Sequence, residues 1–297
     1  MSTQAMSQLE PGSLAIASIV SHPGHRPYND ADPFVRHIYD RALYADKLRG
    51  TIADLAAGRI IAAHHHGIFD GDECAAAAAK AIRHEELCPY DGADDLDHLG
   101  DSLFETGHSA VIDRRYFDGA IASMRRTREL WERGQYPLDL IRAVLDEGSE
   151  RGANLLRIGG RVCPAGLVRV QDNAEIAPHV DHAGRDRRDA IETQQIEVQL
   201  TGVLMLAESE TGGDTTVWPV RLSLPQYDAL RLPEPFAYGI DSALLPPLKV
   251  TLKPRIGDLM LFDARYVHAV SRTGGKPRVS LSFFVGICRD GRIVIFS

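Results

Sequence analysis

The C-terminal half of the chain is patterned as a succession of short β-strands. Runs of alternating or mostly apolar residues, rich in Val, Ile, Leu and Phe, are separated by turns that contain Gly, Pro, Asn and Asp. Eight such runs are typical of a jelly-roll sandwich or barrel, and eight is the number that a double-stranded β-helix needs. The expected strands are 167–170, 175–181, 196–206, 215–218, 248–252, 258–262, 266–270 and 279–285, followed by a ninth at 292–296.

The N-terminal part of the chain is patterned mainly as helices. A helix is expected over 32–44, because it would begin with an Asp cap and a Pro at its first position. A strand is expected over 59–69, and an alanine-rich helix with an acidic first turn follows from Asp70. Apolar residues at helical spacing between about 116 and 151 predict two amphipathic helices that pack on the sheet.

These patterns predict a mainly β fold with helical additions. The core is expected to be a double-stranded β-helix, the cupin-like jelly roll, over about 166–297. A mainly helical supporting region with one or two strands is expected over about 1–165. We expect both parts to form a single domain over 1–297, because this length fits one large β-barrel with helical additions.

Composition and charge narrow the class of protein. The hydrophobic content of 44% and the charged content of 25% are ordinary for a soluble globular protein. A formal net charge of −8 and a pI of about 5.8 would repel a phosphate backbone, so nucleic acid is not an expected partner. The four cysteines lack C-x-x-C spacing, and the sequence shows neither a signal peptide nor an apolar stretch that could cross a bilayer. We therefore expect a cytoplasmic protein with no membrane partner, whose oligomeric state the sequence does not indicate.

Candidate metal ligands stand in the stretch 177–181, which reads Ala-Pro-His-Val-Asp. Side chains alternate between the faces of a strand, so His179 and Asp181 point the same way and can reach one ion. His268, on a later expected strand, would supply a second imidazole. Two imidazoles and a carboxylate cover one face of an octahedral ion and leave three positions open, which is the facial triad of non-haem Fe(II) oxygenases.

Two further motifs accompany these ligands. A turn-rich segment at 272–277 leads into a strand that begins Arg278-Val-Ser280, and a Gly-Gly-Asp turn lies at 212–214. His-x-Asp, a distal His and Arg-x-Ser, in this order and each on an expected strand, resemble the 2-oxoglutarate/Fe(II)-dependent dioxygenase superfamily. The resemblance covers roughly 166–295.

The resemblance implies which cofactors are bound and which residues hold them. His179, Asp181 and His268 would bind Fe(II), 2-oxoglutarate would take two of the open positions, and O2 would take the third. Arg278 is suited to the distal carboxylate of 2-oxoglutarate, because guanidinium offers a planar fork of donors. Ser280 would face the same pocket and add a hydroxyl donor. Ascorbate is expected to stimulate the enzyme.

The resemblance also implies the reaction. Superfamily members convert 2-oxoglutarate to succinate and CO2 while they oxidise an unactivated C–H bond. In the halogenating branch, which residues 168–180 loosely resemble, a small residue replaces the carboxylate ligand so that chloride can bind iron. Asp181 keeps the carboxylate, so we expect hydroxylation, or a related desaturation or cyclisation, and not halogenation. The expected substrate is a small molecule such as an amino-acid derivative or specialised metabolite.

Three other functions remain as alternatives. The first is a protein or peptide side-chain hydroxylase of the same superfamily. The second is a non-catalytic, cupin-like metal-binding sensor or scaffold, which would have no use for the anion fork of Arg278. The third is an oxygenase of the all-histidine cupin type that needs no 2-oxoglutarate, which Asp181 disfavours.

Several other residues carry weaker signals. Arg169 could bind a substrate or co-substrate carboxylate, or it could pair with Asp172 or Glu175. The histidines at 64–66 are expected to be a polar, partly exposed strand segment, because strand neighbours face opposite ways and no carboxylate or Cys stands nearby.

Two segments are candidates for the surroundings of the site. The acidic, turn-rich stretch 89–108 is expected to be a loop, in which His98, Phe104 and His108 are either surface or pocket residues. The Pro-rich connection 221–247 is long enough to fold over the site as a lid or an extra wall.

Overall fold

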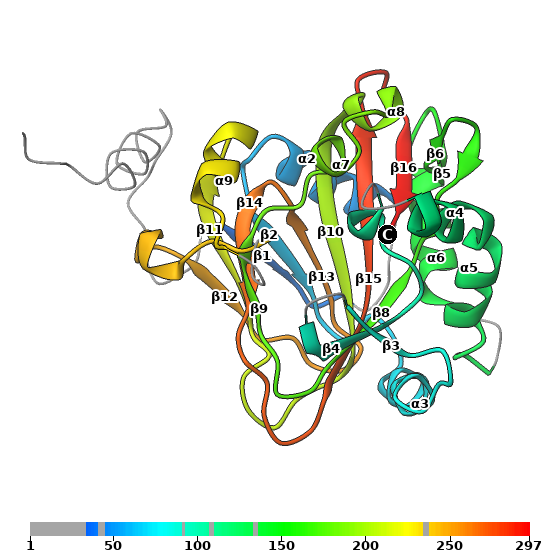
Figure 1. The fold of residues 1–297 in the computed structure, drawn as a ribbon, viewed down its shortest axis with the longest axis vertical. Coiled ribbons are helices and arrows are strands. Elements are labelled where there is room, and N and C mark those ends of the chain that lie inside the picture. Colours follow the sequence, from blue (N-terminus) through cyan, green and yellow to red (C-terminus); the bar gives the residue numbers. More distant parts are fainter. Residues whose placement is uncertain (1–33, 41–44, 91–92, 107–109, 133–135, 234–237) are drawn as a thin grey trace, which may run out of the picture.

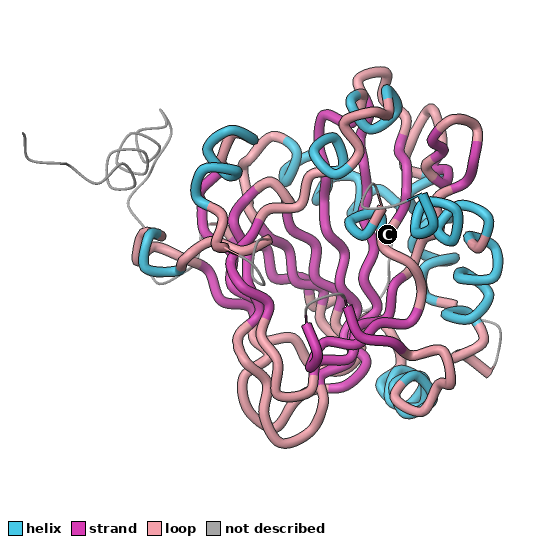
Figure 2. Tube along the Cα trace, in the orientation of Figure 1, coloured by secondary structure: helices cyan, strands magenta, loops and turns pink. Residues whose placement is uncertain are grey.

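The protein is built around two facing β-sheets, and most of its longer helices pack on the outer side of the larger sheet (Figure 1, Figure 2). A computed structural model describes residues 34–40, 45–90, 93–106, 110–132, 136–233 and 238–297.

The larger sheet has ten strands. The long central strands β10 (Ile196–Ala207) and β15 (Arg278–Cys288) pair antiparallel over most of their length, and β16 (Ile293–Phe296) extends the sheet beside β15. In spatial order the main path is β1 (Val35–Ile38), β2 (Ala62–His65), β13 (Leu259–Asp263), β10 (Ile196–Ala207), β15 (Arg278–Cys288), β8 (Leu167–Gln171), β4 (Ala93–Leu99) and β3 (Cys88–Tyr90), with β16 (Ile293–Phe296) between β15 and β5 (Ala153–Leu155).

The smaller sheet has four strands, and a two-stranded hairpin lies apart from both sheets. The order in the smaller sheet is β12 (Val250–Leu252), β11 (Thr215–Arg221), β14 (Tyr266–Val270) and β9 (Ile176–His179), and the hairpin pairs β6 (Arg157–Ile158) with β7 (Arg161–Val162).

Eight α-helices and two 3-10 turns complete the described part of the chain. None of the helices within it has both the length and the apolar character needed to span a membrane. They are α2 (Ala45–Ala56), α3 (Gly71–Ala81), α4 (Ala110–Asp118), α5 (Ala120–Arg128), α6 (Pro137–Glu147), α7 (Ala183–Asp186), α8 (Ile191–Gln194) and α9 (Leu224–Leu230), with 3-10 turns at η1 (Leu103–Glu105) and η2 (Ser242–Leu244).

Side-chain alternation gives the larger sheet an apolar outer face and a partly polar inner face. On β15 the odd-numbered residues from Val279 to Val285 belong to the main hydrophobic core, whereas the even-numbered residues from Arg278 to Phe284 line a cavity between the sheets. The same alternation holds on β10, where Leu200, Leu204 and Leu206 join the core and Gln199, Thr201 and Val203 face the cavity. Each of these two strands therefore contributes one face to the hydrophobic core and the other face to the wall of the cavity.

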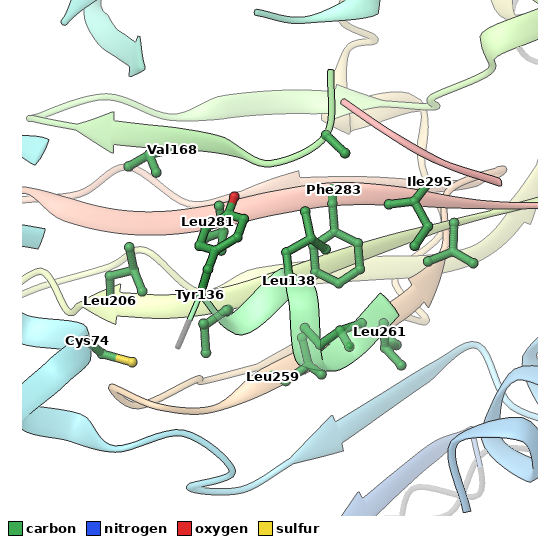
Figure 3. Close-up of a cluster of buried hydrophobic side chains, with 14 of the residues drawn as sticks. Cys74, Tyr136, Leu138, Val168, Leu206, Leu259, Leu261, Leu281, Phe283 and Ile295 are labelled. Carbon is green, nitrogen blue, oxygen red and sulfur yellow. The ribbon is translucent and has the colours of Figure 1, made fainter. Parts of the chain in front are cut away.

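The main core lies between the outer face of the larger sheet and the helices (Figure 3). Tyr136 and Leu138, at the start of α6, point at the sheet, and Cys74 of α3 approaches its far end. Pro137 at the first position of α6 fits there because its missing N–H has no partner within a first helical turn. This packing holds the larger sheet as a rigid wall behind the cavity.

The strands predicted for the C-terminal half are confirmed. Each of the eight expected runs coincides with a strand from β8 to β15, and the ninth is β16. The two faces of these strands differ in polarity and their turns contain Gly, so local pattern and tertiary structure agree.

The predicted N-terminal elements are partly wrong. The expected helix at 32–44 is contradicted by Val35–Ile38, which forms β1 and pairs parallel with β2; the rest of that helix falls partly outside the described residues. Seven strands, β1 to β7, precede Gly166 instead of one or two. The stretch expected as an acidic loop contains the β3–β4 hairpin, which pairs with β8. Long-range pairing outweighs weak local propensity in each case.

The histidines at 64–66 are also placed differently from the expectation. His64 and His65 are each 2% exposed, and Asp258, far away in sequence, supplies the carboxylate that was not expected near them.

We predict opposite effects on stability for two Gly→Ala substitutions. A Cβ at Gly202 on β10 would overlap the buried ring of Phe283 on the outer face of the sheet, so Gly202→Ala should destabilise the fold by about 1–3 kcal/mol. Gly50 is exposed in α2 with nothing near its Cβ position, so Gly50→Ala should stabilise by about 0.5–1 kcal/mol. Urea unfolding measures both. Equal midpoints for the two variants would contradict the close contact between the strands.

Candidate active site

The candidate active site lies in the cavity between the two sheets, which has a volume of about 130 Å³ and opens to solvent. His179 ends β9 and His268 lies in the middle of the neighbouring β14, and the antiparallel register places the two residues directly opposite each other. Their ring centroids are 4.2 Å apart. Asp181 follows two residues later, and its backbone N–H donates to the carbonyl oxygen of Ala264, which fixes the chain where β9 ends.

The three side chains converge on one point. Asp181 Oδ1 is 3.6 Å from His179 Nε2, and Asp181 Oδ2 is 3.2 Å from His268 Nε2. The ligand atoms of all three residues lie within 4.8 Å of one another. The predicted triad is therefore assembled by the fold, with one atom of each residue available for a shared ion.

Both imidazoles are oriented by the backbone. His179 Nδ1 is 2.8 Å from the carbonyl oxygen of Ala177, and His268 Nδ1 is 2.9 Å from that of Tyr266. A carbonyl can only accept, so each Nδ1 donates a proton, and each Nε2 is the ring atom that faces Asp181 and could bind an ion. This is the arrangement that metal-binding histidines have in proteins.

The protonation states also suit a metal. Burial, together with His268, lowers the pKa of His179 to about 3, so this imidazole is neutral near pH 7. Burial opposes ionisation of Asp181, but His179, His268 and Arg169 outweigh it and hold the pKa of this carboxyl well below its usual value. Two neutral imidazoles and one carboxylate are the donor set of the facial triad. The residues present thus fit Fe(II).

Beside the triad, four polar side chains form a square on two paired strands. The register of β15 with β8 places Arg278 opposite Gln171 and Ser280 opposite Arg169, and alternation turns all four toward the cavity side of the sheet. Arg278 Nη1 donates to Gln171 Oε1 at 2.7 Å and to Ser280 Oγ at 3.2 Å. The sequence-predicted pair of Arg278 and Ser280 is therefore brought together beside the triad.

Arg278 is a buried cation with spare donors. It is 3% exposed, its Nε has no hydrogen-bond partner, and no ion pair with it occurs in the described part of the chain. Burial and the neighbouring Arg169 lower its pKa to about 10, which still leaves it charged at pH 7. A buried charge without an ion-pair partner is costly, and an anionic ligand would offset this cost.

Arg169 is a second cation that faces the cavity. Its Nε donates to the hydroxyl of Tyr90 at 3.1 Å. The alternative in which Arg169 pairs with Asp172 or Glu175 is not observed among the described residues, and Glu175 instead lies 3.5 Å from Arg272.

Sequence reasoning missed some residues of the site. Gln171 lies two residues after Arg169 on β8, so strand alternation alone could have placed it on the cavity side. Tyr90 could not have been found, because only the β3–β4 hairpin brings it near β8. Of the candidates in that segment, Phe104 lines the cavity, whereas His98 is buried against Tyr90 with ring centroids 4.3 Å apart. His108 lies outside the described residues.

The connection 221–247 forms a wall of the site, one of the two roles expected for it. The hydroxyl of Tyr238 accepts from the N–H of Ala177 at 3.3 Å, and its ring meets that of His179 edge-on at 5.8 Å. The hydroxyl of Tyr227 on α9 in turn donates to the carbonyl oxygen of Tyr238. This wall covers β9 next to the triad.

Comparison with solved structures confirms the fold class. The chain is similar to an N-substituted L-amino acid dioxygenase from Burkholderia ambifaria AMMD, with 21% identity, a TM-score of 0.58, and coverage of 84% of this chain and 91% of that one. A second structure of that enzyme, in complex with alpha-KG, gives 22% identity, a TM-score of 0.57 and the same coverage. These similarities support the jelly-roll core that the strand pattern predicts.

The match to a known protein family covers most of the chain. No curated protein matches the sequence. A family model described as the carrier-protein-independent halogenase WelO5 matches residues 41–297. The predicted superfamily and enzyme class are thereby confirmed. The chain belongs to the WelO5 halogenase family, within the 2-oxoglutarate/Fe(II)-dependent oxygenases.

Proposed function

We propose that the protein is an Fe(II)- and 2-oxoglutarate-dependent dioxygenase that hydroxylates an unactivated C–H bond of a small carboxylate, such as an amino-acid derivative. The observation that carries this proposal is a complete His-Asp-His triad beside two cavity-facing arginines that lack acidic partners in the described structure. In the overall reaction 2-oxoglutarate, O2 and the substrate R–H give succinate, CO2 and R–OH.

The triad would hold the metal. His179, Asp181 and His268 would bind the ion through two imidazole nitrogens and a carboxylate oxygen, at the lining of the cavity. When bound, Fe(II) supplies the chemistry by which O2 is activated at the expense of 2-oxoglutarate. The chain supplies fixed Nε2 donors and a carboxylate in a partly apolar cavity.

The square of polar residues would hold the co-substrate. Arg278 can present its guanidinium to the distal carboxylate of 2-oxoglutarate, while Ser280 and Gln171 position that guanidinium. Gln171 Nε2 has no hydrogen-bond partner in the structure and could donate to the same ligand.

Charge balance indicates an anionic substrate. Fe(II) and Asp181 together leave one positive charge and Arg278 adds a second, and the two carboxylates of 2-oxoglutarate neutralise both. Arg169 then has no ion-pair partner in the described structure: Asp186, the other acid that lines the cavity, pairs with Arg185 at 2.8 Å, and Asp181 and the buried Glu105 act on Arg169 from beyond ion-pair distance. A single carboxylate on the substrate would neutralise Arg169. The name of the similar Burkholderia enzyme, an N-substituted L-amino acid dioxygenase, agrees with this class of substrate.

The rest of the cavity favours an apolar group on that substrate. Leu96, Leu103, Phe104, Ile176 and Phe284 line it together with Tyr227 and Tyr238. A molecule that carries one carboxylate and an apolar body therefore fits the lining better than a highly charged one.

Asp181 favours hydroxylation over halogenation. The family is named for a halogenase, and halogenation requires a coordination position for chloride. Here the carboxylate of Asp181 lies within 3.6 Å of both imidazoles and is charged. It would take the position that chloride needs.

The test is succinate formation with Fe(II), 2-oxoglutarate, ascorbate and air, in chloride buffer, with pools of N-substituted amino acids. Matched pools contain the decarboxylated analogues. We expect succinate to rise with a carboxylate pool alone and its product to contain one added oxygen. A chlorinated product, or equal stimulation by the decarboxylated pool, would contradict the proposal.

Loss of Arg278 should weaken binding of 2-oxoglutarate. A charge-assisted hydrogen bond contributes about 1.5–3 kcal/mol, so Arg278→Ala should raise the KM for 2-oxoglutarate by about 10- to 100-fold. Arg272→Ala removes an arginine that is exposed on the preceding turn and serves as the control. An unchanged KM in Arg278→Ala would exclude this residue as the carboxylate site.

Replacing Asp181 should change how the metal is held. Loss of a residue that only hydrogen-bonds a metal ligand already lowers metal affinity about 10- to 100-fold. Asp181→Gly removes a ligand itself, so its affinity for Fe(II) should fall by more than about tenfold and hydroxylation should cease. Chloride should restore part of its Fe(II) affinity and leave that of the wild type unchanged. Asp172→Gly, the same change at an exposed turn, should behave as wild type. Turnover of Asp181→Gly at the wild-type rate would rule out Asp181 as a ligand.

Loss of Arg169 should weaken binding of the substrate and not binding of 2-oxoglutarate. Arg169→Leu should raise the KM for the carboxylate substrate by about 10- to 100-fold, with the KM for 2-oxoglutarate changed much less. The reverse split would reassign Arg169 to 2-oxoglutarate. Steady-state kinetics with each component varied in turn gives both constants.

A further inference from the structure

A second cluster of histidines lies on two adjacent strands at the edge of the larger sheet. His37 stands on β1 and His64 opposite it on β2, and His66 follows directly after β2. His64 is also in register with Met260 of β13. Figure 1 shows β1, β2 and β13 side by side in this order. Strand alternation excludes His65, which faces the other side of the sheet.

This cluster is separate from the triad. Asp258, which contacts it, precedes Phe262 by four residues, or about 13 Å along the strand. Phe262 in turn packs against His268 with ring centroids 4.9 Å apart. Apolar side chains of both sheets, among them Val203, Val217 and Met260, fill the space along this direction.

Asp258 orients the buried member of the cluster. His64 Nε2 lies 2.7 Å from Asp258 Oδ2, and the carboxylate also accepts from the N–H groups of Gly67 and Arg255 at 2.7 and 2.9 Å. An ionised carboxylate can only accept, so His64 donates through Nε2, and Nδ1 is the ring atom left to bind an ion. A carboxylate that fixes a histidine in this way is the usual partner of a metal-binding imidazole.

The other two rings complete a set of three donors. His37 Nδ1 and His66 Nε2 are 3.1 Å apart. Two nitrogens bound to one tetrahedral Zn²⁺ at 2.0–2.1 Å would be about 3.3 Å apart. One ligand nitrogen of each of the three histidines lies within 4.8 Å of the other two. His37 and His66 therefore already have the spacing of two ligands on one ion. The rings of His64 and His66 are stacked with centroids 3.9 Å apart, so they would have to turn edge-on toward a shared ion.

We propose that His37, His64 and His66 form a second metal site, for a divalent ion that prefers imidazole, such as Zn²⁺. Three neutral imidazoles would leave a fourth position for water, and this position faces solvent because His37 is exposed and His66 half-buried. The ion would link the edge strand β1 to β2 and, through Asp258, to the turn before β13. Its role would be to stabilise the sheet edge, independently of the oxygenase reaction.

The test uses the full-length, metal-free protein titrated with Zn²⁺ and, separately, with Co²⁺. We expect wild type to bind two equivalents, and the double variant His37→Ala/His66→Ala to bind one. A variant of the triad, His179→Ala/His268→Ala, should keep the second site and show the intense visible absorption of tetrahedral Co²⁺. His84→Ala, which removes a histidine outside both clusters, should bind two equivalents.

Stability provides an independent readout. Zn²⁺ should raise the Tm of the triad variant His179→Ala/His268→Ala. It should not raise the Tm of a variant that also carries His37→Ala and His66→Ala. If alanine at both positions prevents folding, His37→Gln alone should still lower affinity for the second equivalent at least tenfold. Equal stoichiometry and equal Tm shifts with and without His37 and His66, or binding at millimolar Zn²⁺ only, would overturn the proposal. Succinate formation by His37→Ala should remain as in wild type.

Discussion

The register between β9 and β14 is the constraint on which the rest of the site depends. It places His179 directly opposite His268, and strand alternation then directs Asp181 to the same point. A shift by one residue would turn every one of these side chains to the other face of its strand. The larger sheet, held from behind by its helices, supplies Arg278 and Arg169 at fixed positions across the cavity. The chemistry therefore follows from two rigid sheets whose registers are set by buried apolar faces.

Those residues whose role depends on local order along a strand could be predicted from the sequence. His179 and Asp181 share a face because they are two residues apart, and the strands that carry His268 and Arg278 have clear alternating patterns. Contacts made by long-range pairing could not be predicted. Tyr90 reaches Arg169 only because β3 and β4 extend the larger sheet.

The N-terminal edge shows the same limit. A capping signal favoured a helix over 32–44, yet residues 35–38 pair with β2, whose open edge offers a row of backbone hydrogen-bonding groups. The same pairing assembles the second histidine cluster, since it brings His37 to His64, and β13 brings Asp258. No window of the sequence contains this set of residues.

Family membership and the identity of one ligand together define the proposed activity. The chain matches the family of a halogenase over 41–297, but it has a carboxylate between the imidazoles of His179 and His268. The most direct test is the structure of the anaerobic Fe(II) and 2-oxoglutarate complex in chloride-containing solution, by crystallography or X-ray absorption. We predict that Asp181 is bound to iron and that chloride is absent from it. Chloride on the iron with Asp181 displaced would contradict the account.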